Sequence, residues 1–343
     1  MVGGAAIAAA LGAAALFGAS TPAAKLLVGE IHPVLLAGLL YAGSGLGLSI
    51  FLIVQKVGAR PTRADLPWLA GAVLTGGVVG PVLLTTGLLA TSAASASLLL
   101  NLEGVFTALL AWLVFRENFD ARIALGMALI VAGGALLVLE PGAMQGTPLG
   151  ALAVAGACFA WAIDNNLTRK VSAADPALVA AIKGSVAGAA NIALGLALGA
   201  QWPGAAKAAA AAGVGFLGYG VSLALFVVAL RDLGAARTGA YFSTAPFVGV
   251  AIATLVLGEA PGALFWPAAA LMLAGVWLHV SERHEHEHVH EPLEHEHRHV
   301  HDEHHRHDHP PGADGSEPHT HRHRHVRLVH RHPHFPDLHH RHH

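Results

Sequence analysis

The chain has 343 residues, of which 54% are hydrophobic and only 12% are charged, and its formal net charge is −2. Such a composition is too apolar for a soluble domain of this size, so we expect the bilayer to be the solvent of most of the chain. The lack of a strong basic excess disfavours nucleic acid as a partner, and a single cysteine excludes an intramolecular disulfide framework.

The composition changes abruptly after residue 280. Residues 1–280 contain 12 Lys and Arg and 10 Asp and Glu, whereas residues 281–343 contain 8 and 12 of these and 23 of the 25 histidines. We therefore predict a membrane body followed by a polar tail.

About 20 apolar residues are needed to cross the hydrocarbon core of a bilayer. The first segment lacks the basic n-region of a secretory signal, which favours an uncleaved first helix. Long apolar runs without two-residue alternation indicate helices rather than barrel strands. Charges, prolines and glycines separate ten predicted spans, at residues 4–27, 33–55, 66–88, 92–115, 121–139, 148–168, 176–199, 208–230, 234–257 and 262–280.

Basic residues in the connecting loops predict the orientation of these spans. One side carries two, Lys25 and Lys207. The other side carries nine: Lys56, Arg60, Arg63, Arg116, Arg122, Arg169, Lys170, Arg231 and Arg237. The second side is therefore expected to be the cytoplasm, with both termini and the tail on it, in what we expect to be a bacterial inner membrane.

The body also repeats itself weakly at an offset of 142 residues, most visibly between residues 85–140 and 227–282. Glu117 corresponds to Glu259, and Gly133 to Gly275. Half of ten spans is an odd number, so the second copy would enter the membrane in the opposite sense. Inverted repeats are typical of transporters.

Three stretches indicate a family: LFGASTPAAKLL in the first span, SAASASLLLNLEGVFTALLAWLVFRENFDARIALGMALIVAGGALLVL, and its counterpart GAARTGAYFSTAPFVGVAIATLVLGEAPGALFWPAAALMLAGVWL. Over about residues 5–280 the sequence resembles the two EamA domains of the drug/metabolite transporter superfamily. The sequence departs from the family pattern at Gly104, where proline is usual, whereas Pro246 keeps the proline in the second repeat.

The resemblance implies an all-α membrane protein of ten transmembrane helices in two inverted five-helix repeats. The repeats would occupy residues 1–140 and 141–280, with a disordered His-rich tail at 281–343. It also implies a cavity near mid-membrane and export of small metabolites by alternating access, without an enzymatic activity.

Ionisable groups inside the membrane are the candidate functional residues because burying them is costly. Glu103 and Asp164 are expected to line the cavity and bind a coupling proton or a cationic substrate, with neutral hydrogen bonds from Asn101, Asn165 and Asn166. The alternative is structural, in which Lys183 neutralises one acid and the asparagines bridge helices.

The tail alternates histidine with charged residues and contains six prolines, so it is expected to be disordered. Imidazole is a common ligand of Zn, Ni, Co and Cu, and the same histidines could instead tether the tail to lipid at acid pH. The expected ligands are His284, His286, His288, His290, His295, His297, His299, His301, His304, His305, His307, His309, His319, His321, His323 and His325.

These observations favour a secondary-active exporter of a small metabolite with a regulatory metal-binding cytoplasmic tail. The body requires no cofactor; its expected partners are the lipid bilayer, a small-molecule substrate and divalent metal ions, with a homodimer left open. The rivals are an exporter of divalent Zn, Ni or Co and, from another class, a membrane-anchored metal store or sensor.

Overall fold

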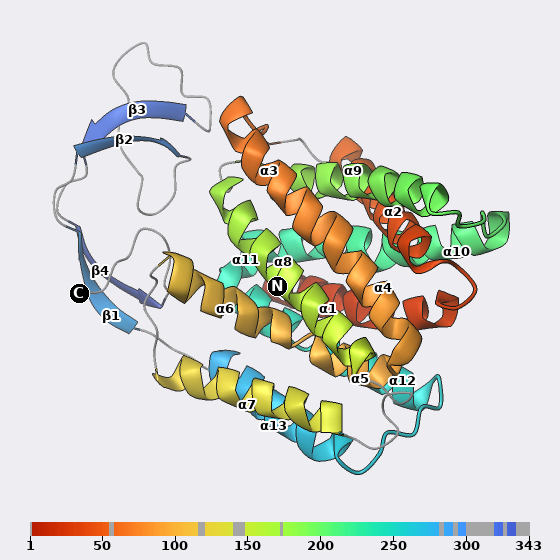
Figure 1. Ribbon diagram of the computed structural model, residues 1–343. Coiled ribbons are helices and arrows are strands. Elements are labelled where there is room, and N and C mark those ends of the chain that lie inside the picture. The colour runs from red at the N-terminus through yellow and green to blue at the C-terminus, as the bar shows by residue number, and fades with distance from the viewer. Residues whose placement is uncertain are drawn as a thin grey trace.

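The computed structural model describes residues 2–54, 58–115, 121–139, 148–171, 174–280, 285–290, 294–299, 319–324 and 328–333. The named elements up to residue 280 are all helices, and they gather into one bundle (Figure 1). The first half contains α1 (Val2–Leu27), α2 (Pro33–Val54), η1 (Arg63–Asp65), α3 (Leu66–Ala72), η2 (Val73–Val79), α4 (Gly80–Ala90), α5 (Ala93–Leu99), α6 (Leu102–Phe115) and α7 (Ala121–Leu139).

The second half has a similar series of helices. It contains α8 (Leu149–Thr168), η3 (Arg169–Val171), α9 (Pro176–Ala197), α10 (Ala205–Gly215), η4 (Phe216–Val221), α11 (Ser222–Phe242), α12 (Ala245–Leu255) and α13 (Phe265–Val280). The segments η2 and η4 are π-helical and continue directly into α-helices on both sides. Such π segments are rare and often lie at functional sites.

Eight helical segments among the described residues are long and apolar enough to cross a membrane, and they match eight of the ten predicted spans. The other two predicted spans coincide with α8 and α13, which are helical but do not meet the same length and hydropathy criteria. The polar run from Asp164 to Asn166 lowers the hydropathy of α8, and the apolar part of α13, Phe265–Leu278, is short.

Helices α2 and α9 pack against each other through small residues. A Cβ atom added at Gly45 would lie 2.7 Å from the backbone nitrogen of Ser185, and one at Gly188 would lie 2.5 Å from that of Ala42. Helix association in lipid depends on this close backbone approach, because lipid tails are as apolar as the side chains. The α2–α9 pair therefore forms a rigid wall of the bundle.

Helix ends are fixed by local signals in the sequence. The Asp175 side chain accepts hydrogen bonds from the backbone nitrogens of Ala177 (2.9 Å) and Leu178 (3.2 Å), and Pro176 follows at the first helical position of α9. At the other end, Gly199 adopts φ +85° and lets the chain leave the helix.

Four short segments of the tail form β-strands, whereas the whole tail is predicted to be disordered. The structure has strands β1 (Glu285–His290) and β4 (Leu328–Pro333), which pair antiparallel, and β2 (Glu294–His299) and β3 (His319–Arg324), which do the same (Figure 1). In these segments histidine alternates with other residues, which is the two-residue period of a strand. The prediction of disorder rests on composition, and composition alone does not show this period. The other residues of the tail lie outside the described residues.

We predict that Gly43→Ala destabilises the bundle, because the added methyl group would overlap the backbone carbonyl of Ala212 in α10. Overpacking of this kind costs about 1–3 kcal/mol, so the unfolding midpoint in detergent should fall by several degrees. Gly213→Ala is the matched control, since a Cβ there meets nothing within 4 Å. Equal midpoints in a heating series followed by size-exclusion chromatography would contradict this packing.

Candidate functional site

A cavity of about 280 Å³ lies inside the bundle, among residues from both halves of the chain. Its walls come from α1, α2, α6, α8, α9, η4 and α11. The lining residues are Phe17, Tyr41, Ser44, Glu103, Trp161, Asp164, Asn165, Ala180, Lys183, Gly184, Tyr219, Ser222, Leu223 and Phe242. We call this space the central cavity.

An ion pair lies on one wall of the central cavity. The Lys183 Nζ atom on α9 lies 2.5 Å from Asp164 Oδ1 and 2.6 Å from Oδ2 on α8. The Thr168 hydroxyl, one turn further along α8, donates to Asp164 Oδ1 at 2.9 Å. The side chains of the pair are 17% and 8% exposed, so each ion compensates the other in a poorly hydrated place.

Glycine makes room for this ion pair. A Cβ atom at Gly76, in the π segment η2, would overlap the Asp164 carboxylate. The π segment thus places a residue without a side chain next to the Asp164 carboxylate. A residue with a side chain at this position would displace the carboxylate from Lys183.

The second acid of the cavity, Glu103, accepts a hydrogen bond from Asn165. The Asn165 Nδ2 atom lies 2.9 Å from Glu103 Oε1 and 3.3 Å from the Thr107 hydroxyl. This carboxylate is paired with a neutral amide rather than with a cation. It is therefore the acid on which a proton or a cationic group of a ligand would change the charge balance most directly.

Two aromatic side chains bind the carbonyl that the π segment exposes. The Tyr41 hydroxyl donates to the Gly76 carbonyl at 2.7 Å, and Trp161 Nε1 donates to the same oxygen at 2.9 Å. In a regular α-helix this carbonyl would accept from the fourth following residue, so the two aromatics satisfy a group that the local helix geometry leaves open.

A chain of aromatic rings covers another wall of the cavity. The ring centroids of Phe17 and Tyr219 are 5.8 Å apart, those of Phe17 and Phe242 are 5.2 Å apart, and those of Tyr41 and Tyr219 are 5.9 Å apart. The central cavity thus has a charged wall and an aromatic wall, which suits a ligand with both charged and apolar parts.

The residues predicted from the sequence separate into two groups. Glu103, Asp164, Asn165 and Lys183 all line the central cavity. Asn101 donates to the Leu98 carbonyl at 2.8 Å and lines a neighbouring cavity, and Asn166 donates to the Ala162 carbonyl at 2.9 Å. Asn165, next to Asp164, therefore lies in the cavity, whereas Asn166 also donates to the Thr107 carbonyl at 3.3 Å and so connects α8 to α6.

The aromatic residues of the cavity could not be singled out from the sequence, because aromatic side chains are ordinary in an apolar span. A residue-level signal existed only for Trp161, which precedes Asp164 by about one helical turn and so lies on the same face of α8.

The predicted metal ligands cannot be placed as a coordination site. Within the described parts of the chain, no three His, Cys, Asp or Glu side chains are grouped so that they could hold a metal ion. His286, His288, His290, His295, His297, His299, His319, His321 and His323 belong to the strands β1, β2 and β3. The remaining predicted ligands, His284, His301, His304, His305, His307, His309 and His325, lie outside the described residues.

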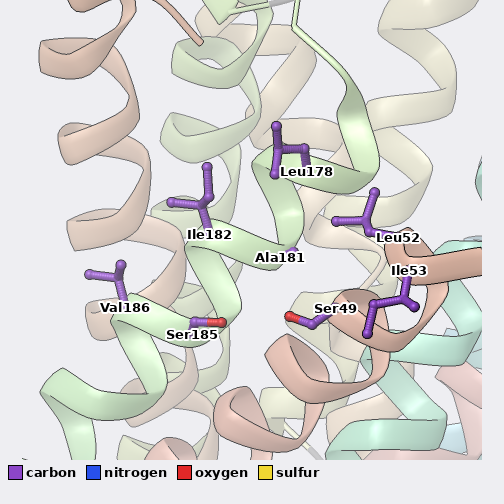
Figure 2. Close-up of a pocket in the computed structure, with 8 residues that line it drawn as sticks. All are labelled: Ser49, Leu52, Ile53, Leu178, Ala181, Ile182, Ser185 and Val186. Carbon is purple, nitrogen blue, oxygen red and sulfur yellow. The ribbon is translucent and has the colours of Figure 1, made fainter. Parts of the chain in front are cut away.

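A further depression, shown in Figure 2, lies between α2 and α9. Ser49 and Ser185 point toward each other across it, and Leu178, Ile182 and Val186 lie along α9 at its side. Its lining is otherwise apolar and belongs to one helix pair only, without an ionisable group. It therefore does not share the chemistry of the central cavity.

One end of the bundle is held by a charged cross-connection that we call the Glu259 clasp. The two carboxylate oxygens of Glu259 accept from the backbone nitrogens of Ala93 and Ala94, each at 2.8 Å. Lys25 Nζ donates to the carbonyl of Thr91 at 2.9 Å, in the short connection before α5. In the sequence, Glu259 stands out only as the counterpart of Glu117. In the structure it caps a helix of the other half.

The apolar helices and the internal charged cavity define an integral membrane protein of the transporter class. The model of the EamA-like transporter family matches residues 4–139 and again residues 148–281, so the chain belongs to this family. Membership in a transporter family indicates a transport role rather than an enzymatic one.

Individual similar proteins agree with this assignment. An "uncharacterized transporter" of Methanothermobacter thermautotrophicus is 30% identical over 284 residues, which cover 76% of this chain and 82% of the relative. A "probable terminal-alkyne amino-acid exporter" of Streptantibioticus cattleyicolor is 30% identical over 222 residues, covering 64% and 74%. A crystal structure with 18% identity and a TM-score of 0.59 covers 79% of this chain and 95% of that chain, which supports the fold alone.

We predict that Asp164→Asn abolishes transport, because the amide keeps the shape of the side chain but leaves the Lys183 charge unpaired. Breaking a buried pair costs about 3–5 kcal/mol, so expression should fall as well. The double variant Asp164→Asn with Lys183→Met removes both charges and should recover expression without flux.

Glu103→Gln should fold normally and lose coupled flux. Wild-type flux in these variants at normal expression would leave the acids with structural roles only.

Proposed function

We propose that the protein is a secondary-active exporter of a small amphoteric metabolite, one that carries both an ammonium and a carboxylate group. The observation that carries this proposal is the ion pair of Asp164 and Lys183 on the wall of the central cavity. Separating either ion from its partner in a low-dielectric environment costs free energy. A ligand that brings both charges can replace each partner and leave no ion unpaired.

The same logic defines the binding mode. The substrate carboxylate would bind Lys183, and its ammonium would bind Asp164 or Glu103. Asn165 offers a neutral hydrogen bond, and the ring chain of Phe17 and Tyr219 offers an apolar surface. A neutral or singly charged ligand would open the pair without replacing it. The description of one relative as an amino-acid exporter supports this substrate class.

Alternating access requires two halves that can exchange conformations. We propose two inverted five-helix repeats at residues 1–140 and 141–280, which together form ten membrane helices. The offset of 142 relates α2 to α9 within about one residue, and it relates the two π segments, Val73–Val79 and Phe216–Val221, in the same way. The two separate matches of the family model support this division.

The Glu259 clasp supports a transporter closed at one end. It joins a residue of the proposed second repeat to helix α5 of the first, beside Lys25 on α1. The excess of Lys and Arg on the other side of the bundle supports an orientation in which the clasp lies outside and both termini are cytoplasmic.

Flux into inside-out vesicles tests the function. We predict accumulation of radiolabelled neutral amino acids, at least about tenfold faster than matched amines or carboxylic acids, since these leave one buried charge unpaired. Lys183→Met should reduce the preference for a carboxylate. Counterflow of Zn, Ni or Co without amino-acid flux would favour the metal exporter, and flux of neither would favour a membrane-anchored metal store or sensor.

We propose further that the tail binds divalent transition metals and regulates transport. The pairing register places His286 opposite His332 and His288 opposite His330 in one ribbon, and His295 opposite His323 and His297 opposite His321 in the other. Histidines paired in this way are close along the backbone, and imidazole is a frequent metal ligand. The tail would then bind metal near the mouth of the transporter.

Deleting residues 284–343 tests the tail. We predict that the truncated protein inserts and transports but loses its response to added Zn, Ni or Co. In the full-length protein this response should weaken as pH falls from about 8 to about 5.5, because protonated imidazoles cannot bind a metal. The same response to metal in both proteins across this range would rule out regulation by the tail.

A further inference from the structure

A second cavity, of about 270 Å³, adjoins the central cavity. The two cavities have three lining residues in common, Phe17, Glu103 and Phe242. We call the second space the side chamber. Its lining consists of Phe17, Leu100, Asn101, Glu103, Gly104, Ile130, Gly239, Phe242, Ser243, Ala245, Pro246 and Val276.

The side chamber lies where two helical spans are interrupted. Helix α5 ends at Leu99 and α6 begins at Leu102, while α11 ends at Phe242 and α12 begins at Ala245. Both interruptions line the chamber, and Ile130 of α7 and Val276 of α13 close it on another side. Breaks between helices inside a membrane bundle are typical of substrate sites.

The chemistry of the side chamber is mainly apolar. The two uncharged polar side chains that line the chamber donate to their own helices, Asn101 to the Leu98 carbonyl at 2.8 Å and Ser243 to the Ala240 carbonyl at 2.7 Å. The Glu103 carboxylate stands at the boundary and is bound by Asn165 on the central side. A group held deeper in the chamber would therefore contact hydrocarbon.

Two glycines keep the side chamber open. A Cβ atom at Gly104 in α6 or at Gly239 in α11 would meet nothing within 4 Å. Glycine weakens a helix, and close helix packing does not explain it at these two positions, in contrast to Gly43. Both glycines line the side chamber, so they leave volume there that a side chain would fill.

We propose that the side chamber is the subsite for the apolar substituent of the substrate, and that Gly104 and Gly239 determine how large this substituent can be. This inference rests on the proposed function, in which the charged groups of the same solute bind Asp164 and Lys183. The substituent would enter the side chamber at the boundary formed by Phe17, Glu103 and Phe242, the three residues that line both cavities.

The test measures flux for a series of α-amino acids with side chains that lengthen by one methylene at a time. In Gly104→Val and Gly239→Val the added methyl groups should exclude the end of long side chains. The ratio of the apparent KM of a long side chain to that of alanine should rise about fourfold for each methylene that is no longer buried. Gly104→Ala and Gly239→Ala should show smaller shifts in the same direction.

Gly213→Val is the matched control, because Gly213 also has nothing within 4 Å and lies in α10, outside both cavities. It should leave the whole series unchanged. If the wild-type protein transports the series and the Gly104 and Gly239 variants change all members equally or none, the subsite is wrong and the proposed function stands. If the wild-type protein transports no amino acid, both are wrong.

Discussion

The ion pair between Asp164 and Lys183 sets the main constraint on the interior of this bundle. Each ion is costly in a bilayer by itself, so the pair fixes the distance and the rotation between α8 and α9. The neighbouring residues follow from it. Gly76 is bare because the carboxylate occupies the place of a side chain, and the π segment that carries Gly76 exposes a carbonyl that Tyr41 and Trp161 bind.

Glycine has three different uses in this chain. At Gly45 and Gly188 it lets α2 and α9 approach, at Gly76 it makes room for a charged group, and at Gly104 and Gly239 it borders open space. The sequence alone does not distinguish these three uses of glycine. Only the clearance around the missing Cβ atom separates a glycine that serves helix packing from one that borders a site.

The sequence predicted those features that follow from composition and from the cost of burial. Segment lengths located the helices, and the rarity of charges in them singled out Glu103, Asp164 and Lys183. Contacts between distant spans could not be predicted, because Phe17, Tyr41 and Tyr219 look like ordinary apolar residues until the helices are assembled. The interruption at Leu100 and the π segments are invisible to hydropathy, since a broken helix and an intact one are equally apolar.

Under the proposed two-repeat arrangement, the two halves differ in conformation at one informative place. The connection at Thr91 and Ser92 separates α4 from α5 and is held by the Glu259 clasp, whereas the offset of 142 carries it to Leu233 and Gly234 within the uninterrupted α11. Sequences of common origin thus adopt two helix geometries in one molecule. An exchange of these geometries between the halves would open the clasped end and close the other, while Asp164 and Lys183, on the uninterrupted helices α8 and α9, keep the substrate in the middle.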